Sequence, residues 1–304
     1  MNLYFKKYFF IIQLFIFSLD VFALNKQFPA DNYDYKPVQD IGIRQYEATS
    51  LHGTKKIVLT FDDGPNTHVT PKILDLLNKY NVKATFFINT SNLDSKKIPI
   101  AYRILEEGHI LASHDFDHRD NNKENENVFR EGLLRSIFDI KKLERNLGLV
   151  KKGIYFRFPY GYYGLNAAYH HMNVIKEVSK KVYDENCINF VFWDIDTKDW
   201  GPGMTSLEIS QNVKSYMMGG KATTVFMENN RWVKKIINIQ KPLMGGVVLL
   251  HDKREETYYA TESILKMAND LNWDVVPLSS VKEFSFDKKE CLIKKDMSLS
   301  SLGN

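Results

Sequence analysis

Short runs of β-branched and aromatic residues alternate with longer stretches of helical periodicity from about residue 57 to residue 284. This alternation is typical of βαβ units and a parallel sheet. We interpret the chain as an α/β protein whose elements pack as a distorted (β/α) barrel of seven or eight strands. The pattern predicts strands at 57–61, 83–88, 109–113, 154–158, 190–195, 246–251 and 273–277, and helices at about 70–80, 96–107, 127–147, 171–184, 205–218 and 257–271.

The first 23 residues have the pattern of a signal peptide. Lys6 and Lys7 precede an apolar run that reaches Leu19, and a small-residue cleavage pattern ends at Ala23. The run is about half the length that spans a bilayer. We expect a secreted, periplasmic or cell-envelope protein, with membrane association only if the leader is uncleaved.

The rest of the chain divides around one catalytic domain. Residues 24–56 are polar with scattered aromatics and predict an irregular N-terminal arm, and 57–284 form the barrel. Residues 219–245 exceed a plain connection and predict an insertion. It is interpreted either as a hairpin lid over the site or as an embellishment on the barrel wall. Residues 285–304 are a C-terminal tail without periodic signal.

Composition bears on the size of the core, on nucleic acid as a partner and on the state of the cysteines. The 304 residues are 44% hydrophobic, which suffices for one large core, and we expect a monomer. A formal net charge of +4 is too small to indicate nucleic acid as a partner. Cys187 and Cys291 are too far apart for a metal knuckle or redox motif, and they either pair or remain buried free thiols.

Polar clusters follow five predicted strands, at the point where each strand ends. In a parallel barrel these ends open on one face, where active sites are built. The sequence therefore predicts one active site at the C-terminal ends of the strands, formed from Asp62-Asp63, Ser113 to His118, Arg157 to Tyr160, Asp194 to Trp200, and His251-Asp252.

The adjacent carboxylates Asp62 and Asp63 indicate a metal site only in combination with a histidine pair. Paired aspartates before Gly-Pro are ordinary turn chemistry, and a lone histidine pair is weak evidence. His114 and His118, however, are four residues apart at the end of another strand. One aspartate with two histidines suits zinc or a neighbouring transition metal and leaves positions open for water and substrate.

Two further strand ends carry groups that fit a hydrolytic site. Arg157 ends an apolar strand and needs a carboxylate partner, for which Asp62 is the candidate. His251 ends another apolar strand and suits proton transfer if a carboxylate orients its ring. We assign that orienting role to Asp196.

With these segments together, the chain resembles the polysaccharide deacetylases of the NodB-homology type, carbohydrate esterase family 4. The motifs TFDDGP, SHDFDH, RFPYG, DTKDW and LLH occur in the family's order between Thr60 and His251. Taken together they are highly specific and cover most of the mature chain.

The resemblance implies a role for each matched residue. Asp62 would be the catalytic base held by Arg157, and His251 the general acid tuned by Asp196. The implied ligands of a divalent metal, zinc ahead of cobalt, nickel or manganese, are Asp63, His114 and His118. Substrate contacts would come from the Tyr160 backbone N–H, which faces the oxyanion, and from Trp200 and Leu249, which form a slot for the acetyl methyl.

The implied activity is hydrolysis of N-acetyl groups from N-acetylglucosamine residues of a glycan polymer. Peptidoglycan ranks ahead of chitin oligosaccharides, and an O-deacetylase of acetylated xylan is the alternative reaction. A non-catalytic glycan-binding protein on the same scaffold ranks last because no base or ligand is lost. The sequence departs from the family at Asp115, where Ser or Thr is usual, and at Arg119, where Pro is frequent.

Overall fold

The structure, a computed structural model, describes residues 48–163, 170–183, 186–286, 291–295 and 297. The predicted signal peptide and the arm up to residue 47 lie outside these ranges. Among the described helices, none is both long and apolar enough to cross a membrane.

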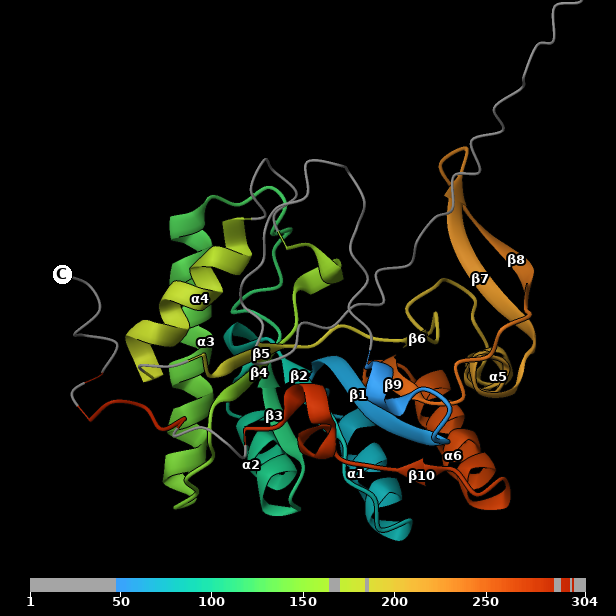
Figure 1. Cartoon of the computed structure of the whole chain (residues 1–304), viewed down its shortest axis with the longest axis horizontal. Helices are drawn as coiled ribbons and strands as arrows, with labels where there is room; N and C mark the ends of the chain where they lie inside the picture. The colour runs from blue at the N-terminus through green and yellow to red at the C-terminus, as the bar shows by residue number, and fades with distance from the viewer. Residues whose placement is uncertain (1–47, 164–169, 184–185, 287–290, 296, 298–304) are drawn as a thin grey trace, which may run out of the picture.

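A curled sheet of parallel strands lies at the centre of the molecule, with helices around it (Figure 1). Its order is β5-β4-β3-β2-β1-β9-β6, and the short β10 pairs with the start of β1. These neighbours confirm the predicted parallel barrel. The strands are β1 (Lys56–Gly64), β2 (Thr85–Ile88), β3 (Ile110–Ser113), β4 (Ile154–Phe156), β5 (Ile188–Phe190), β6 (Ile195–Asp196), β9 (Gly246–His251) and β10 (Asp274–Val275).

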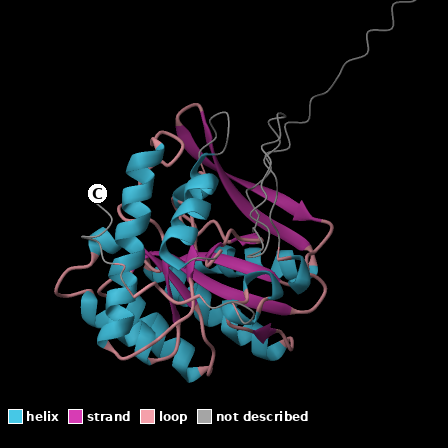
Figure 2. Cartoon of the chain, turned by 60° about the vertical axis from the view of Figure 1, so that its left-hand side comes forward, coloured by secondary structure: helices cyan, strands magenta, loops and turns pink. Residues whose placement is uncertain are grey.

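Helices pack against the sheet close to where the periodicity predicts them (Figure 2). Local signals set their starts: Asn125 accepts two backbone N–H groups at one N-terminus, and Thr205 forms a capping box with Glu208 at another. The α-helices are α1 (Val69–Lys79), α2 (Ile98–Glu106), α3 (Glu126–Asn146), α4 (His170–Tyr183), α5 (Ser206–Met218) and α6 (Glu255–Asp270), and the short 3-10 helices are η1 (Thr49–Leu51), η2 (Thr90–Asn92), η3 (Pro159–Gly161), η4 (Leu278–Ser280) and η5 (Lys282–Phe284).

The single strand predicted at 190–195 is wrong, because the chain there crosses from one edge of the sheet to the other. β5 pairs with β4 at one edge, whereas β6 pairs with β9 at the opposite edge. Between them, the Val191 N–H donates to the Phe156 carbonyl and the Asp194 N–H donates to the Val247 carbonyl. The crossing segment 191–194 thus links both edges and curls the sheet into a distorted barrel.

The predicted insertion at 219–245 contains an antiparallel hairpin, β7 (Gly220–Glu228) and β8 (Arg231–Ile239). Its base is fixed to α5, because the Asn212 side chain donates to the Thr223 carbonyl and accepts from the Thr223 N–H. Both views show the hairpin projecting beyond the barrel (Figures 1 and 2).

The described part of the C-terminal tail is joined to the sheet. Cys187, which immediately precedes β5, forms a disulfide with Cys291, so the pairing alternative holds. The Gly153 N–H donates to the Cys291 carbonyl, and Tyr155 and Asn189 donate side-chain hydrogen bonds to the Phe284 carbonyl. The segment after η5 therefore packs along β4 and β5.

Candidate active site

Asp62 and Asp63 face the same side because β1 contains a bulge between them. Asp62 pairs with Phe87 of β2, whereas Gly64 pairs with Ile88, so Asp63 is the extra residue, with φ of 72°. In a regular strand consecutive side chains point to opposite faces, and a bulge redirects one of them. Two adjacent carboxylates can then serve one site.

Asp63, His114 and His118 come together as a group that could hold a metal ion. Asp63 Oδ1 lies 2.9 Å from His118 Nε2 and 3.4 Å from His114 Nε2. This oxygen is buried, and neither contact has the geometry of a hydrogen bond. His114 Nδ1 lies 2.8 Å from the Arg157 carbonyl, which fixes the ring and turns Nε2 toward Asp63. The donor set and its orientation fit a divalent cation.

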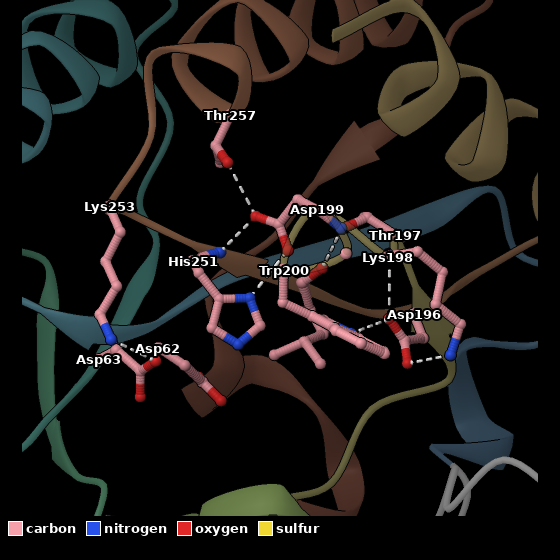
Figure 3. Close-up of polar contacts among 12 residues, drawn as sticks. Asp62, Asp63, Asp196, Thr197, Lys198, Asp199, Trp200, His251, Lys253 and Thr257 are labelled. Atoms are coloured by element: carbon pink, nitrogen blue, oxygen red, sulfur yellow. Dashed lines mark hydrogen bonds and ion pairs between the residues drawn. The ribbon is translucent and has the colours of Figure 1, made fainter. Parts of the chain in front are cut away.

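The second oxygen of Asp63 has a partner that the sequence did not reveal. Lys253 Nζ donates to Asp63 Oδ2 at 2.8 Å, and Figure 3 shows this contact beside His251. Burial raises the pKa of Asp63, but the adjacent imidazoles of His114 and His118 outweigh burial and hold that pKa well below its usual value. The carboxylate is therefore ionised, as a ligand requires.

Arg157 is buried and holds Asp62, as predicted from the sequence. Arg157 Nη1 donates to Asp62 Oδ1 at 2.7 Å and to Thr60 Oγ1 at 2.8 Å. Its remaining donors reach the carbonyls of Val191 and Phe192 in the crossing segment. Asp62 Oδ2 lies 3.7 Å from His114 Nε2, so this oxygen faces the metal-ligand group.

The predicted pairing of Asp196 with His251 is wrong, and Asp199 is the partner. Asp199 Oδ1 lies 2.8 Å from His251 Nδ1, while Oδ2 accepts from the His251 N–H and from the Thr257 hydroxyl (Figure 3). Burial lowers the pKa of His251, but the adjacent Asp199, together with Asp63 and Asp62, outweighs burial and raises that pKa to about 9.

Strand register explains why Asp196 does not reach His251. Asp196 pairs with Leu249, two residues before His251 in β9. Its carboxylate instead accepts from the Lys198 N–H and ammonium and from the Trp200 indole N–H. Only a residue farther along the loop reaches the level of His251, and this is the signal that could have identified Asp199.

The three predicted substrate-contact residues surround these groups. Tyr160 is 55% exposed, and its ring centre lies 4.7 Å from that of His118. Trp200 is 38% exposed at the rim, whereas Leu249 is buried. Leu249 shares a strand face with His251, since the two are two residues apart in β9.

Asp115 hydrogen-bonds away from the metal-ligand group. It accepts from the Phe116 N–H and from the Asn121 side chain. Burial raises its pKa to about 6, although these hydrogen bonds oppose the change. The departure from the family pattern at this position is therefore accommodated by a local network.

Several residues of the mouth have a backbone conformation that side chains rarely adopt. A positive φ costs energy for residues other than glycine and persists only where the surrounding structure enforces it. Such residues are enriched at active sites. Here they occur at Asp63 (72°), Asp115 (65°), His118 (58°), Tyr160 (58°) and Lys198 (62°). Four of the polar strand-end clusters thus contain such a residue.

Comparisons with known proteins identify the family of the chain. A family model described as polysaccharide deacetylase matches residues 50–175. A peptidoglycan-N-acetylglucosamine deacetylase of Bacillus cereus is 33% identical over 184 residues, which span 60% of this chain and 60% of that protein's own length. A second protein of that name from the same organism is 32% identical over 236 residues, 76% of this chain and 89% of the relative.

A solved structure has the same fold. It is the Bc1960 peptidoglycan N-acetylglucosamine deacetylase in complex with 4-naphthalen-1-yl-N-oxidanyl-benzamide, with a TM-score of 0.57 and 26% identity. The match covers 77% of this chain and 91% of that one. The chain therefore belongs to the polysaccharide deacetylase family of the NodB-homology type, carbohydrate esterase family 4.

Proposed function

We propose that the protein is a metal-dependent polysaccharide N-deacetylase. It removes N-acetyl groups from N-acetylglucosamine residues of a glycan polymer, with peptidoglycan as the polymer, and releases acetate. The names of the two Bacillus cereus relatives support this substrate. One observation carries the proposal: the Asp63, His114 and His118 group lies beside a carboxylate held by Arg157, and a histidine held by Asp199 ends the neighbouring strand.

The metal we propose is Zn²⁺, held by Asp63 Oδ1 and the Nε2 atoms of His114 and His118. Zinc sites in enzymes commonly combine three such nitrogen and oxygen ligands with an open position. When bound, a divalent cation acts as a Lewis acid that lowers the pKa of a water from about 15.7 to about 7. Cobalt, nickel and manganese accept the same donors.

The chain's own residues then carry the proton transfers. Asp62 takes a proton from the attacking water through Oδ2, because Oδ1 is held by Arg157. The water oxygen bonds to the acetamide carbon, and the Tyr160 N–H donates to the oxygen on which negative charge develops. His251 donates a proton from Nε2 to the nitrogen as the C–N bond breaks, which leaves a free amine and acetate.

Asp199, Trp200 and Leu249 support these steps. Asp199 fixes the His251 tautomer with Nδ1 protonated, so Nε2 faces the reaction. Trp200 and Leu249 supply apolar surface for the acetyl methyl. Asp196 positions the loop through Lys198 and Trp200 rather than acting on His251.

We also propose that the protein acts outside the cytoplasm as a monomer. The leader at 1–23 has the pattern of an export signal, and peptidoglycan is an extracytoplasmic polymer. If the leader stays attached, the same catalytic domain works from the membrane surface. Residues 24–56 are the arm of this domain, 57–284 its catalytic barrel and 285–304 its tail.

The decisive experiment is mass spectrometry of peptidoglycan fragments, chitin oligosaccharides and acetylated xylan after incubation with the chain from residue 24 onward. We expect loss of one acetyl mass from the first two substrates, abolished by a chelator and restored by added zinc. Acetate release from xylan alone would replace the proposal with an O-deacetylase.

Asp62→Asn tests the proposed base. We expect kcat to fall by about 10²- to 10⁴-fold, since general base catalysis contributes that much in studied enzymes. Asp75→Asn is the matched control, because Asp75 lies on the exposed side of α1 and pairs with Arg103. Full activity of Asp62→Asn on every acetylated glycan would contradict the mechanism.

A further inference from the structure

The β7–β8 hairpin is held against the loop that carries part of the active site. Lys234 Nζ in β8 donates to the Gly203 carbonyl and to both carboxylate oxygens of Glu208 at the start of α5. A methyl at Gly201 would collide with the side chain of Val225 in β7, so this side chain packs directly against the loop backbone at Gly201. The hairpin therefore has a defined position relative to residues 197–205.

Trp232 lies on the face of the hairpin that is turned toward this loop. The register pairs Met227 with Trp232 and Val225 with Lys234, and side chains two residues apart share a face. Lys234 and Val225 both contact the loop, so Trp232 is directed the same way. Its ring centre lies 5.5 Å from that of Trp200, with the planes 72° apart.

Trp200 joins this aromatic pair to the active site. Its indole N–H donates to Asp196, and the Lys198 ammonium lies 5.4 Å from its ring centre. The neighbouring residue, Asp199, holds His251. The two indoles are therefore continuous with the mouth of the barrel, although they come from segments 32 positions apart in the chain.

We propose that Trp232, together with Trp200, binds a sugar ring of the glycan chain next to the residue that is deacetylated. This inference rests on the proposed function. Trp232 is 47% exposed and Trp200 is 38% exposed, so both side chains keep surface that a ligand can contact. A pyranose ring has an apolar face of C–H groups and an equatorial rim of hydroxyls, which suits an exposed indole face beside polar groups.

Trp232 and Trp200 together form what we call the platform. It extends the active site in one direction, which suits a carbohydrate polymer. A single N-acetylated sugar needs only the groups at the C-terminal ends of the strands. A polymer has further sugar rings, which extend beyond these groups. The hairpin supplies surface there that the barrel itself does not. Trp232 is then a specificity-determining residue that favours long substrates.

Trp232→Ala tests the inference, with Phe226→Ala as the matched control. Phe226 is also exposed on the hairpin, but it pairs with Val233 and so lies on the opposite face. Deacetylation of the monosaccharide N-acetylglucosamine and of its hexasaccharide is measured for the wild type and both variants. We expect Trp232→Ala to lower kcat/KM on the hexasaccharide by about five- to tenfold, through KM, a loss equivalent to one aromatic contact.

The N-acetylglucosamine rate of Trp232→Ala should change by less than about twofold on the same reasoning, since a single ring bound for deacetylation leaves no second ring to contact the two indoles. Phe226→Ala should match the wild type on both substrates. Equal chain-length preference in the wild type and Trp232→Ala would overturn the inference. Trp232→Tyr, which keeps an aromatic ring, should give an intermediate value and guards against a folding defect.

A binding measurement separates this inference from the proposed reaction. Titration of the hexasaccharide by calorimetry with the Asp62→Asn protein should give a Kd about five- to tenfold higher when Trp232→Ala is added. If the wild type deacetylates nothing while Trp232 still governs binding, the proposed function fails and the platform stands. If deacetylation occurs but Trp232→Ala binds equally well, the platform fails alone.

Discussion

Two aspartates three residues apart, Asp196 and Asp199, have different surroundings and therefore different chemistry. Burial raises the pKa of Asp196, but the ion pair and hydrogen bonds with Lys198 outweigh burial, so the pKa is lowered overall. Asp199 faces His251 and the Thr257 hydroxyl. The same residue type thus positions a loop in one place and the proposed general acid in the other.

Asp199→Asn should lower kcat and change the pH profile. Asp199 is the main group that raises the pKa of His251 to about 9, with Asp63 and Asp62 adding to it, so a general acid at this position stays protonated up to about that pH. Without the carboxylate the pKa of His251 falls, and the alkaline limb of kcat against pH should move to lower pH. Measurement of kcat between pH 5 and 10 is the test.

Asp196→Asn is the control for this shift. Because Asp196 makes no hydrogen bond to His251 in the described structure, its alkaline limb should move less than that of Asp199→Asn. An equal shift in both variants would mean that the long-range field, not the hydrogen bond, sets the pKa of His251. Thermal unfolding of both proteins checks that each is folded.

At the scale of elements, a bulge positions active-site residues at one end of the sheet, and a disulfide holds the chain at the other end. The bulge at Asp63 places two carboxylates together at the end of β1. At the other end of the sheet, the disulfide ties the C-terminal segment to the start of β5. Cys187 precedes its strand, whereas the active site follows the strands, so the two features lie at opposite ends of the barrel.

Replacement of both cysteines by alanine should lower stability without changing catalysis. The disulfide closes a sequence separation of 104, and native disulfides typically contribute about 2 to 4 kcal/mol. We expect the free energy of unfolding in urea to fall by that amount, with kcat and KM unchanged. A large loss of activity in a folded double variant would show that the two ends of the barrel are coupled.

At the scale of the whole molecule, Arg157 joins closure of the barrel to formation of the site. It projects from the end of β4, holds Asp62 in β1, and donates to carbonyls of the crossing segment. Its guanidinium also lies 4.1 Å from the ring centre of Phe87 in β2. One side chain therefore links parts of the sheet that are distant in sequence.

Arg157→Met should damage stability and activity together. Removal of one partner from a buried ion pair costs about 3 to 5 kcal/mol, because it leaves an uncompensated charge. We expect a lower urea midpoint and a large fall in kcat. Arg157→Lys keeps the charge but not the planar donors, so it should recover part of the stability and little of the activity.

Much of the fold was predictable because its signals are local. The helices follow the apolar periodicity closely, and α5 begins at a recognisable capping box. The strand at 190–195 was mispredicted because Val191, Phe192 and Trp193, which link β5 to β6, are themselves apolar and look like the middle of one strand. Nothing local distinguishes one strand from two short ones that pair at opposite edges.

The sequence by itself determined the order of elements, the strand-end position of the polar clusters, and the close spacing of His114 and His118. These depend on neighbours along the chain. The tertiary structure alone decided that Asp199 rather than Asp196 holds His251, that Lys253 meets Asp63, and that Trp232 lies beside Trp200. Each of these contacts depends on strand register and loop path between segments that are remote in sequence, which local patterns do not encode.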